Sequence, residues 1–194
     1  MKHHQETEIK LEVRDLGAIR RRLAALEFRP IEARHFESNV LFDFRDLRLR
    51  KARCLLRLRF AGGKSVLTFK GAPLRARQYK IRREIEALVE GGPRLKEIFH
   101  SFGLRKLFRY DKYRTVYARR SKSKSAATPT LVLDETPIGD YAELEGSKTW
   151  IERVASQLGY GRGDYIVASY GDLYRQKCLE RGRKPGDMVF SSRK

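Results

Sequence analysis

The strongest constraint on the fold comes from residues 6–13, where charged and apolar side chains alternate. Successive side chains of a β-strand point to opposite faces. A strand here places Glu6, Glu8 and Lys10 on one face, and Ile9, Leu11 and Val13 on the other. For a single strand, this pattern indicates a sheet with one surface open to water and the other packed on a core.

The same alternation recurs along the chain, and the sign of the charge changes from one segment to the next. Further strands are predicted over 35–42, 55–60, 65–70, 79–87, 110–117, 130–134 and around 143–145. Their charged positions are Arg57, Arg59, Lys70, Lys80, Arg82, Glu84, Glu86, Lys112, Arg114, Asp134, Glu143 and Glu145. Eight strands of this kind predict a closed antiparallel barrel with a charged lumen and an apolar outer wall.

An apolar outer wall needs cover, and four segments with apolar side chains at helical spacing can supply it. They span residues 15–26, 93–102, 147–158 and 165–181. Pro93 is placed for a helix start, and Gly103 and Gly159 are placed for helix ends. The sequence therefore predicts an α+β fold, an eight-stranded antiparallel β-barrel with helices packed on the outside.

Length and composition agree with one compact domain. The chain has 194 residues, of which 41% are hydrophobic, and we expect a domain over residues 1–180 followed by a basic tail over 181–194 that is disordered or loosely docked. No apolar run is long enough for a membrane span and no signal-peptide pattern opens the chain, so we expect a soluble, cytoplasmic protein. The sequence leaves open whether it is a monomer or a homodimer.

Two short features are interpreted structurally. Cys54 and Cys178 lack the spacing of metal ligands, so we expect buried free thiols. The sequence Gly62-Gly63-Lys64-Ser65 resembles the end of a P-loop, but Leu58 occupies the required upstream glycine position and a hairpin turn is expected instead. Residues 121–128, rich in Ser, Lys and Ala, are expected to form a mobile loop.

The net charge of +19 has two interpretations. Basic clusters at 45–53, 119–124 and 181–194 are compatible with RNA or DNA binding, because neutralising phosphates releases counterions. However, many cations lie on the charged faces of strands, where a barrel would concentrate them around a small polyphosphate.

The motifs in their order resemble the CYTH domain, also called the triphosphate tunnel metalloenzyme family. They are ExExK at 6–10, RxR at 57–59, Lys70, RxExE at 82–86, KxR at 112–114, and the stretch 133–146 with Asp134, Glu143 and Glu145. The resemblance spans residues 5 to 175. The family includes class IV adenylate cyclases, thiamine triphosphatases and inorganic triphosphatases, and it implies an eight-stranded tunnel that holds a polyanion and divalent metals.

A triphosphate carries several negative charges, so its recognition needs cations on several sides, and guanidinium groups can bind phosphate oxygens bidentately. The candidate triphosphate-binding residues are Lys10, Arg57, Arg59, Lys70, Arg82, Lys112 and Arg114. Lys80 lies in the same row but close to a strand start, and it is the weaker candidate.

Carboxylates beside phosphates repel them unless a cation intervenes, and hard Mg²⁺ or Mn²⁺ ions bridge carboxylates to phosphates. If the first and last strands pair, Glu6 and Glu8 lie beside Glu143 and Glu145, and the resemblance implies two ions there. Asp134, Glu84 and Glu86 either complete the metal shell or orient water; ion pairs with lumen bases are the alternative. The resemblance implies a catalytic set of Glu6, Glu8, Lys10, Asp134, Glu143 and Glu145.

The expected activity is metal-dependent hydrolysis of a triphosphate compound, with inorganic tripolyphosphate giving pyrophosphate and phosphate as the first candidate. A class IV adenylate cyclase, which converts ATP to cyclic AMP and pyrophosphate, is the second candidate, and a thiamine triphosphatase is the third. A polyphosphate- or RNA-binding module without turnover is the alternative that is not an enzyme. The expected partner is a small triphosphate substrate, and no association with a membrane is expected.

Overall fold

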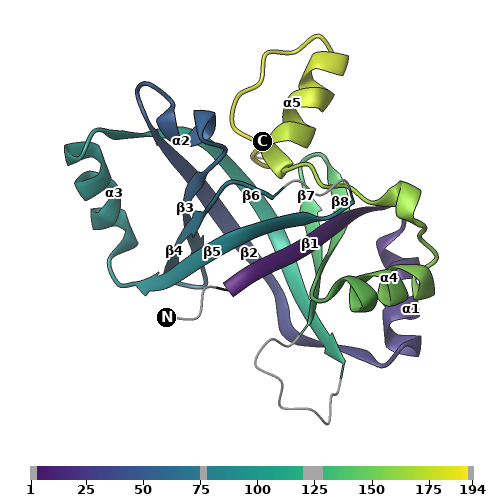
Figure 1. The fold of residues 1–194 in the computed structure, drawn as a ribbon. Coiled ribbons are helices and arrows are strands. Elements are labelled where there is room, and N and C mark those ends of the chain that lie inside the picture. Colours follow the sequence, from purple (N-terminus) through teal and green to yellow (C-terminus); the bar gives the residue numbers. More distant parts are fainter. Residues whose placement is uncertain (1–3, 75–77, 120–128, 192–194) are drawn as a thin grey trace.

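A closed antiparallel barrel forms the centre of the computed structural model, which describes residues 4–74, 78–119 and 129–191 (Figure 1). Its strands are β1 (His4–Val13), β2 (Phe28–Phe44), β3 (Leu55–Ala61), β4 (Lys64–Lys70), β5 (Lys80–Val89), β6 (Leu104–Arg119), β7 (Thr130–Thr136) and β8 (Gly139–Glu145). They pair in the order β1-β5-β4-β3-β2-β6-β7-β8, and β8 closes onto β1. The predicted eight-stranded barrel and the predicted pairing of first and last strands are confirmed.

Five α-helices of the described residues lie outside the barrel (Figure 1). They are α1 (Leu16–Ala25), α2 (Arg48–Lys51), α3 (Gly92–Ser101), α4 (Lys148–Gln157) and α5 (Tyr170–Glu180), with a short 3₁₀ turn, Arg162–Asp164, before α5. Local sequence fixes several starts: the Asp15 carboxylate accepts from the Ala18 amide, and the Ser147 hydroxyl accepts from the Trp150 amide. No described helix is long and apolar enough to span a membrane.

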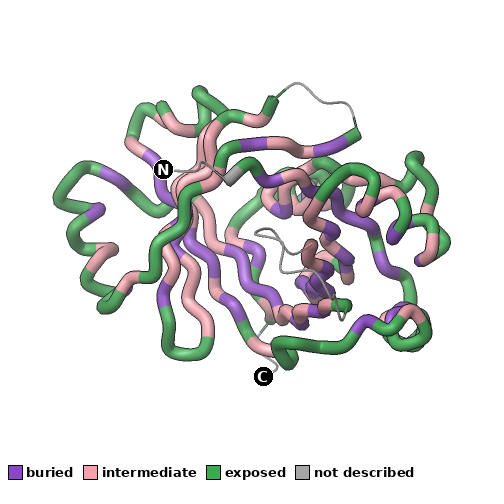
Figure 2. The backbone as a smooth tube through the Cα atoms, turned by 60° about the horizontal axis from the view of Figure 1, so that its bottom comes forward, coloured by how far each residue is buried: buried purple, intermediate pink, exposed green. Residues whose placement is uncertain are grey.

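The apolar outer faces of the strands form the core together with the helices. Ile9, Leu11 and Val13 of β1 are buried in one cluster with side chains of α1 and α4, among them Leu23 and Ile151. A second cluster joins Val40, Phe42 and Leu58 to Phe99 of α3. Figure 2 shows buried segments alternating with half-buried ones along the strands, as expected for a barrel that packs helices outside and polar side chains within.

Three elements differ from the sequence prediction. β2 and β6 are longer than the predicted 35–42 and 110–117, and their ladder contains register irregularities near Pro30, Glu32 and Leu41. The short helix α2 was not predicted. Cys54 is half-buried, so the expectation of a buried thiol is correct only for Cys178.

The expectation of a disordered or loosely docked tail is wrong for the part of the tail that the structure describes. Met188 is fully buried, its amide donates to the Arg109 carbonyl at 2.9 Å, and its carbonyl accepts from the Asp111 amide at 2.9 Å. One buried side chain and two backbone hydrogen bonds thus fasten the segment after α5 to β6. The predicted loop at 121–128 lies outside the described residues.

The two ends of the barrel are defined by the connections between antiparallel strands. The α2 turn (residues 45–53) and α5 lie at one end, called here the α5 end, as Figure 1 shows. The hairpin of Gly62 and Gly63, both with positive φ, lies at the other, called the hairpin end. This hairpin confirms that the Gly62–Ser65 motif forms a turn between strands.

Candidate active site

A cavity of about 1460 Å³ runs through the barrel, and all eight strands and the start of α5 contribute to its lining. The charged residues that the sequence assigned to the lumen line it: Glu6, Glu8, Lys10, Arg57, Arg59, Lys70, Lys80, Arg82, Glu84, Glu86, Lys112, Arg114, Glu143 and Glu145. Asp134 does not line the cavity because it is fully buried behind the lining side chains. The barrel therefore encloses a polar tunnel with acids and bases interleaved.

The wall formed by β1 and β8 brings the two ExE pairs together. Glu8 pairs with Glu145 across the ladder, and Lys10 pairs with Glu143. The Lys10 ammonium lies 3.2 Å from Glu143 and 3.6 Å from Glu8. These two carboxylates outweigh the effect of burial and raise the pKa of Lys10, so the ammonium stays charged inside the barrel.

Two adjacent carboxylates of β1 have opposite electrostatic environments. Burial, together with repulsion from Glu8 and Glu84, raises the pKa of Glu6 to about 8 although Lys70 lies 2.7 Å away. Burial would also raise the pKa of Glu8, but Lys10 and Lys80 outweigh it and lower that pKa. Lys80 lies 3.0 Å from Glu8, and burial lowers its own pKa to about 8. Lys80 therefore belongs to the interacting charged residues that line the lumen.

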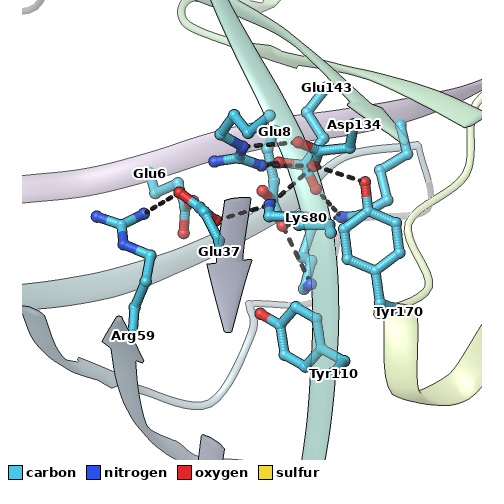
Figure 3. A network of polar contacts seen from close by, with 12 residues as sticks. Glu6, Glu8, Glu37, Arg59, Lys80, Tyr110, Asp134, Glu143 and Tyr170 are labelled. Atoms are coloured by element: carbon cyan, nitrogen blue, oxygen red, sulfur yellow. Dashed lines mark hydrogen bonds and ion pairs between the residues drawn. The ribbon is translucent and has the colours of Figure 1, made fainter. Parts of the chain in front are cut away.

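Asp134 of β7 organises the part of the site next to Glu143 (Figure 3). Its carboxylate accepts hydrogen bonds from Lys112 at 2.9 Å, from Arg114 at 2.7 and 2.6 Å, and from the Tyr170 hydroxyl at 2.8 Å. Arg114 also contacts Glu143. Each oxygen of Asp134 is thus occupied by donors of the protein, an arrangement that positions two cations of β6 at the cavity wall.

Sequence reasoning missed Glu37 of β2, which is buried among cations. Its carboxylate lies 3.5 Å from Lys112, 3.6 Å from Arg59 and 3.5 Å from His35. Burial opposes ionisation, but Lys112, Arg114, Arg59 and Arg57 lower the pKa of Glu37 to about 2. A sequence signal existed, since His35, Glu37 and Asn39 alternate as a strand face does.

Tyr110 and Tyr170 were also missed as site residues. Tyr170 reaches the lumen from the first position of α5, and the Lys10 and Lys112 ammonium groups lie 5.2 and 5.4 Å from its ring centre. The Tyr110 hydroxyl lies 3.4 Å from Arg57. A tyrosine at the start of an amphipathic helix has the sequence pattern of a packing residue. The pattern therefore does not distinguish Tyr170 as a site residue from a core residue.

The arginines of β3 and β5 differ in how far the protein neutralises them. Arg57 donates to Thr68 at 3.1 Å and to Glu86 at 3.3 Å. Arg82 is only 8% exposed, yet no described acid lies within ion-pair distance of it, and its Nε has no hydrogen-bond partner. Arg82 is thus a buried guanidinium that the described part of the protein leaves without a counter-charge.

The acids offer the oxygen ligands that Mg²⁺ and Mn²⁺ prefer. Glu6, Glu8, Glu143 and Glu145 all line the cavity from two adjacent strands, so the donor chemistry fits such ions. Among the described residues, however, no three acids, histidines or cysteines converge as a metal-binding group. Lysines hold several of these carboxylates instead, and ion binding requires those side chains to move.

Comparison with known proteins places the chain in a family. The family model of the CYTH domain matches residues 4–170, which is most of the chain. The protein therefore belongs to the CYTH domain family.

Individual relatives agree with this assignment. A protein of Methanocaldococcus jannaschii named "Putative adenylate cyclase" is 28% identical over 142 residues, covering 73% of this chain and 77% of the relative. A structure from Vibrio parahaemolyticus with a similar name aligns with a TM-score of 0.72 at 17% identity, covering 89% and 98% of the two chains. A Hippeastrum adenylyl cyclase candidate, described as having a dominant triphosphatase activity, aligns with a TM-score of 0.60 at 19% identity, covering 93% and 97%.

Proposed function

We propose that the protein hydrolyses a triphosphate compound with Mg²⁺ or Mn²⁺, and that inorganic tripolyphosphate is its substrate. The observation that carries this proposal is Arg82, a guanidinium that is 8% exposed and lacks an acidic partner among the described residues. A buried charge without a partner is costly, so an anion is expected to complete the site. Phosphate oxygens match the fork of a guanidinium group.

The surrounding cations suit a ligand with several phosphates. Arg57 and Arg59 of β3, Lys70 of β4 and Lys112 and Arg114 of β6 line the same cavity as Arg82. Preorganised cations on several walls stabilise the charge that develops on the phosphoryl group during in-line transfer. Asp134 and Glu37 hold three of them, Lys112, Arg114 and Arg59, in place through the contacts described above, and so act as positioning residues.

The acids of β1 and β8 have a second role in this proposal. Glu6, Glu8, Glu143 and Glu145 are the residues that would hold two divalent ions. Such ions polarise phosphoryl oxygens and lower the pKa of water when bound. Lys10, which lies between Glu8 and Glu143, lowers the pKa of these two carboxylates, and its ammonium moves aside when they bind an ion.

Hydrolysis is favoured over cyclisation because charged side chains dominate the described lining of the lumen and the Tyr170 ring among them is already engaged. The hydroxyl of Tyr170 is bound to Asp134, and two ammonium groups lie near its ring. The Hippeastrum neighbour, described with a dominant triphosphatase activity, supports the same choice. Adenylate cyclase activity is the second candidate, because the other two relatives carry the name "putative adenylate cyclase".

A matched pair of variants tests the proposal. Arg82→Ala should lower kcat/KM for tripolyphosphate by about tenfold to a hundredfold, because a buried hydrogen bond to a charged group contributes about 1.5–3 kcal/mol. Arg94→Ala removes the same charge from the exposed surface of α3 and should leave kcat/KM unchanged. Equal effects of both substitutions, or no turnover of tripolyphosphate by the wild type, would contradict the proposal.

A further inference from the structure

The α2 turn, residues 45–53, places a group of cations at the α5 end of the cavity. Arg45, Arg48, Arg50, Lys51 and Arg53 are all exposed there, and Arg50 and Arg53 line the cavity. Arg48 is paired with Asp46 at 3.1 Å. Within the described ranges, the other four cations have no acidic partner, although carboxylates elsewhere in the lumen are paired with bases.

The turn is held in one conformation by a buried carboxylate. Asp43, which is 2% exposed, accepts hydrogen bonds from the backbone amides of Phe44, Leu49 and Arg50 at 2.7, 3.0 and 2.9 Å. Leu47 and Arg53 have φ values of 58° and 57°. Side chains other than glycine adopt this conformation only where the surroundings enforce it, and such positions cluster at functional sites. The cations are thus presented on a preorganised turn.

The two ends of the cavity differ in charge. At the hairpin end, acids and a base are mixed, since Glu32, Glu145 and Lys64 line the cavity there. At the α5 end, Arg50 and Arg53 line the cavity together with Arg175 of α5, which is 3.4 Å from Asp172. A cleft edge lined mainly by one sign of charge attracts the opposite charge. Anions are therefore attracted to the α5 end.

The α2 turn also continues directly into the phosphate-binding wall. β3 begins at Leu55, and the inward-facing Arg57 follows two residues later, about 7 Å along the strand. Cations therefore form a row from the exposed turn, through Arg57, to Arg59 inside the barrel. A short triphosphate in the lumen does not need the outer part of this row.

We propose that the α2 turn binds the phosphates of a linear polyphosphate that extend out of the α5 end, so that the protein binds chains longer than three phosphates in addition to tripolyphosphate. The inference rests on the proposed function, because it assumes that the tunnel holds the end of the same chain. Arg50 and Arg53 are the principal contacts, and the turn sets the preferred chain length.

The surroundings of the turn favour polyphosphate over RNA. Single-stranded RNA binding uses free aromatic faces for base stacking. The Phe44 ring is covered by the Arg48 guanidinium at 4.2 Å, and Phe108 and Tyr174 stack on each other with ring centres 5.9 Å apart. A polyphosphate needs only the cations, which the turn supplies.

The test compares the double variant Arg50→Ala/Arg53→Ala with the matched control Arg94→Ala/Arg153→Ala, which removes two exposed arginines from α3 and α4. Calorimetry at about 0.15 M salt measures the Kd of a long, size-fractionated linear polyphosphate and of tripolyphosphate. The turn variant should weaken long-chain binding about tenfold and change tripolyphosphate binding less than about twofold. The control should change neither Kd.

Each other outcome is decisive. An equal loss for both chain lengths, or an equal loss in the control, would show diffuse electrostatics and overturn the inference. Tighter binding of single-stranded RNA than of polyphosphate, lost in the turn variant, would assign the surface to RNA instead. The binding measurement does not depend on turnover, so the two proposals can fail separately. A wild-type protein that does not hydrolyse tripolyphosphate would refute the proposed function. An unchanged long-chain Kd in the turn variant would refute this inference alone.

Discussion

Replacing Asp134 by asparagine isolates the charge that organises the β6 side of the tunnel. The substitution keeps the shape of the side chain and removes its charge. Asp134 is fully buried and accepts hydrogen bonds from Lys112, Arg114 and Tyr170. Removing one partner of a buried ion pair costs about 3–5 kcal/mol. Since Arg114 keeps Glu143 and Lys112 keeps Glu37, we expect a loss of about 3 kcal/mol, at the lower end of this range.

The loss can be measured by urea unfolding followed through the fluorescence of Trp150, the single tryptophan of the chain, which packs against the main core cluster. A loss of about 3 kcal/mol corresponds to a decrease of about 6–12 °C in Tm for a domain of this size. The control is Glu27→Gln, which breaks an exposed pair with Arg119 and should cost about 0–1 kcal/mol. If Asp134→Asn cost no more than Glu27→Gln, the buried cluster would not hold the cations as argued.

Three further outcomes follow from the site. Glu8→Gln or Glu145→Gln should nearly abolish tripolyphosphate hydrolysis, and EDTA should do the same to the wild type until Mg²⁺ or Mn²⁺ is added; full turnover in EDTA would exclude the metal role. Arg59→Ala should lower kcat/KM about tenfold, whereas Arg94→Ala should not, as phosphate-release assays can show. The lowered pKa of Glu37 stabilises the fold at pH values above the ordinary value of 4.5, and this contribution is lost as pH falls toward about 2. In Glu37→Gln, the free energy of unfolding should therefore depend less on pH in that range than in the wild type.

The alternation of residues 6–13 and its repeats was sufficient to predict the barrel, because a period of two fixes which face of each strand carries charge. It also predicted most of the lumen, since a residue on the charged face of a barrel strand can point only inward. The proximity of Glu8 to Glu143 and Glu145 followed from closure of the barrel, whereas the register that sets Glu8 opposite Glu145 did not.

The remaining site residues depend on contacts that the pattern does not encode. Glu37 alternates with His35 and Asn39 on β2, but only the pairing with β6 places it opposite Lys112 and so identifies it as a partner of lumen cations. Tyr170 belongs to a helix, and only the docking of α5 over the barrel end brings it to Asp134. Met188 is held by its buried side chain and two backbone hydrogen bonds to β6, and such an anchor has no period in the sequence.

The central claim is that the charged tunnel hydrolyses a triphosphate. Its most direct test is to incubate the wild-type protein with Mg²⁺ or Mn²⁺ and, in parallel, tripolyphosphate, ATP or thiamine triphosphate, and to identify the products. The account predicts that orthophosphate is released fastest from tripolyphosphate, with pyrophosphate as the other product. Cyclic AMP and pyrophosphate formed from ATP would contradict it in favour of a cyclase, and the absence of any turnover would contradict an enzymatic role.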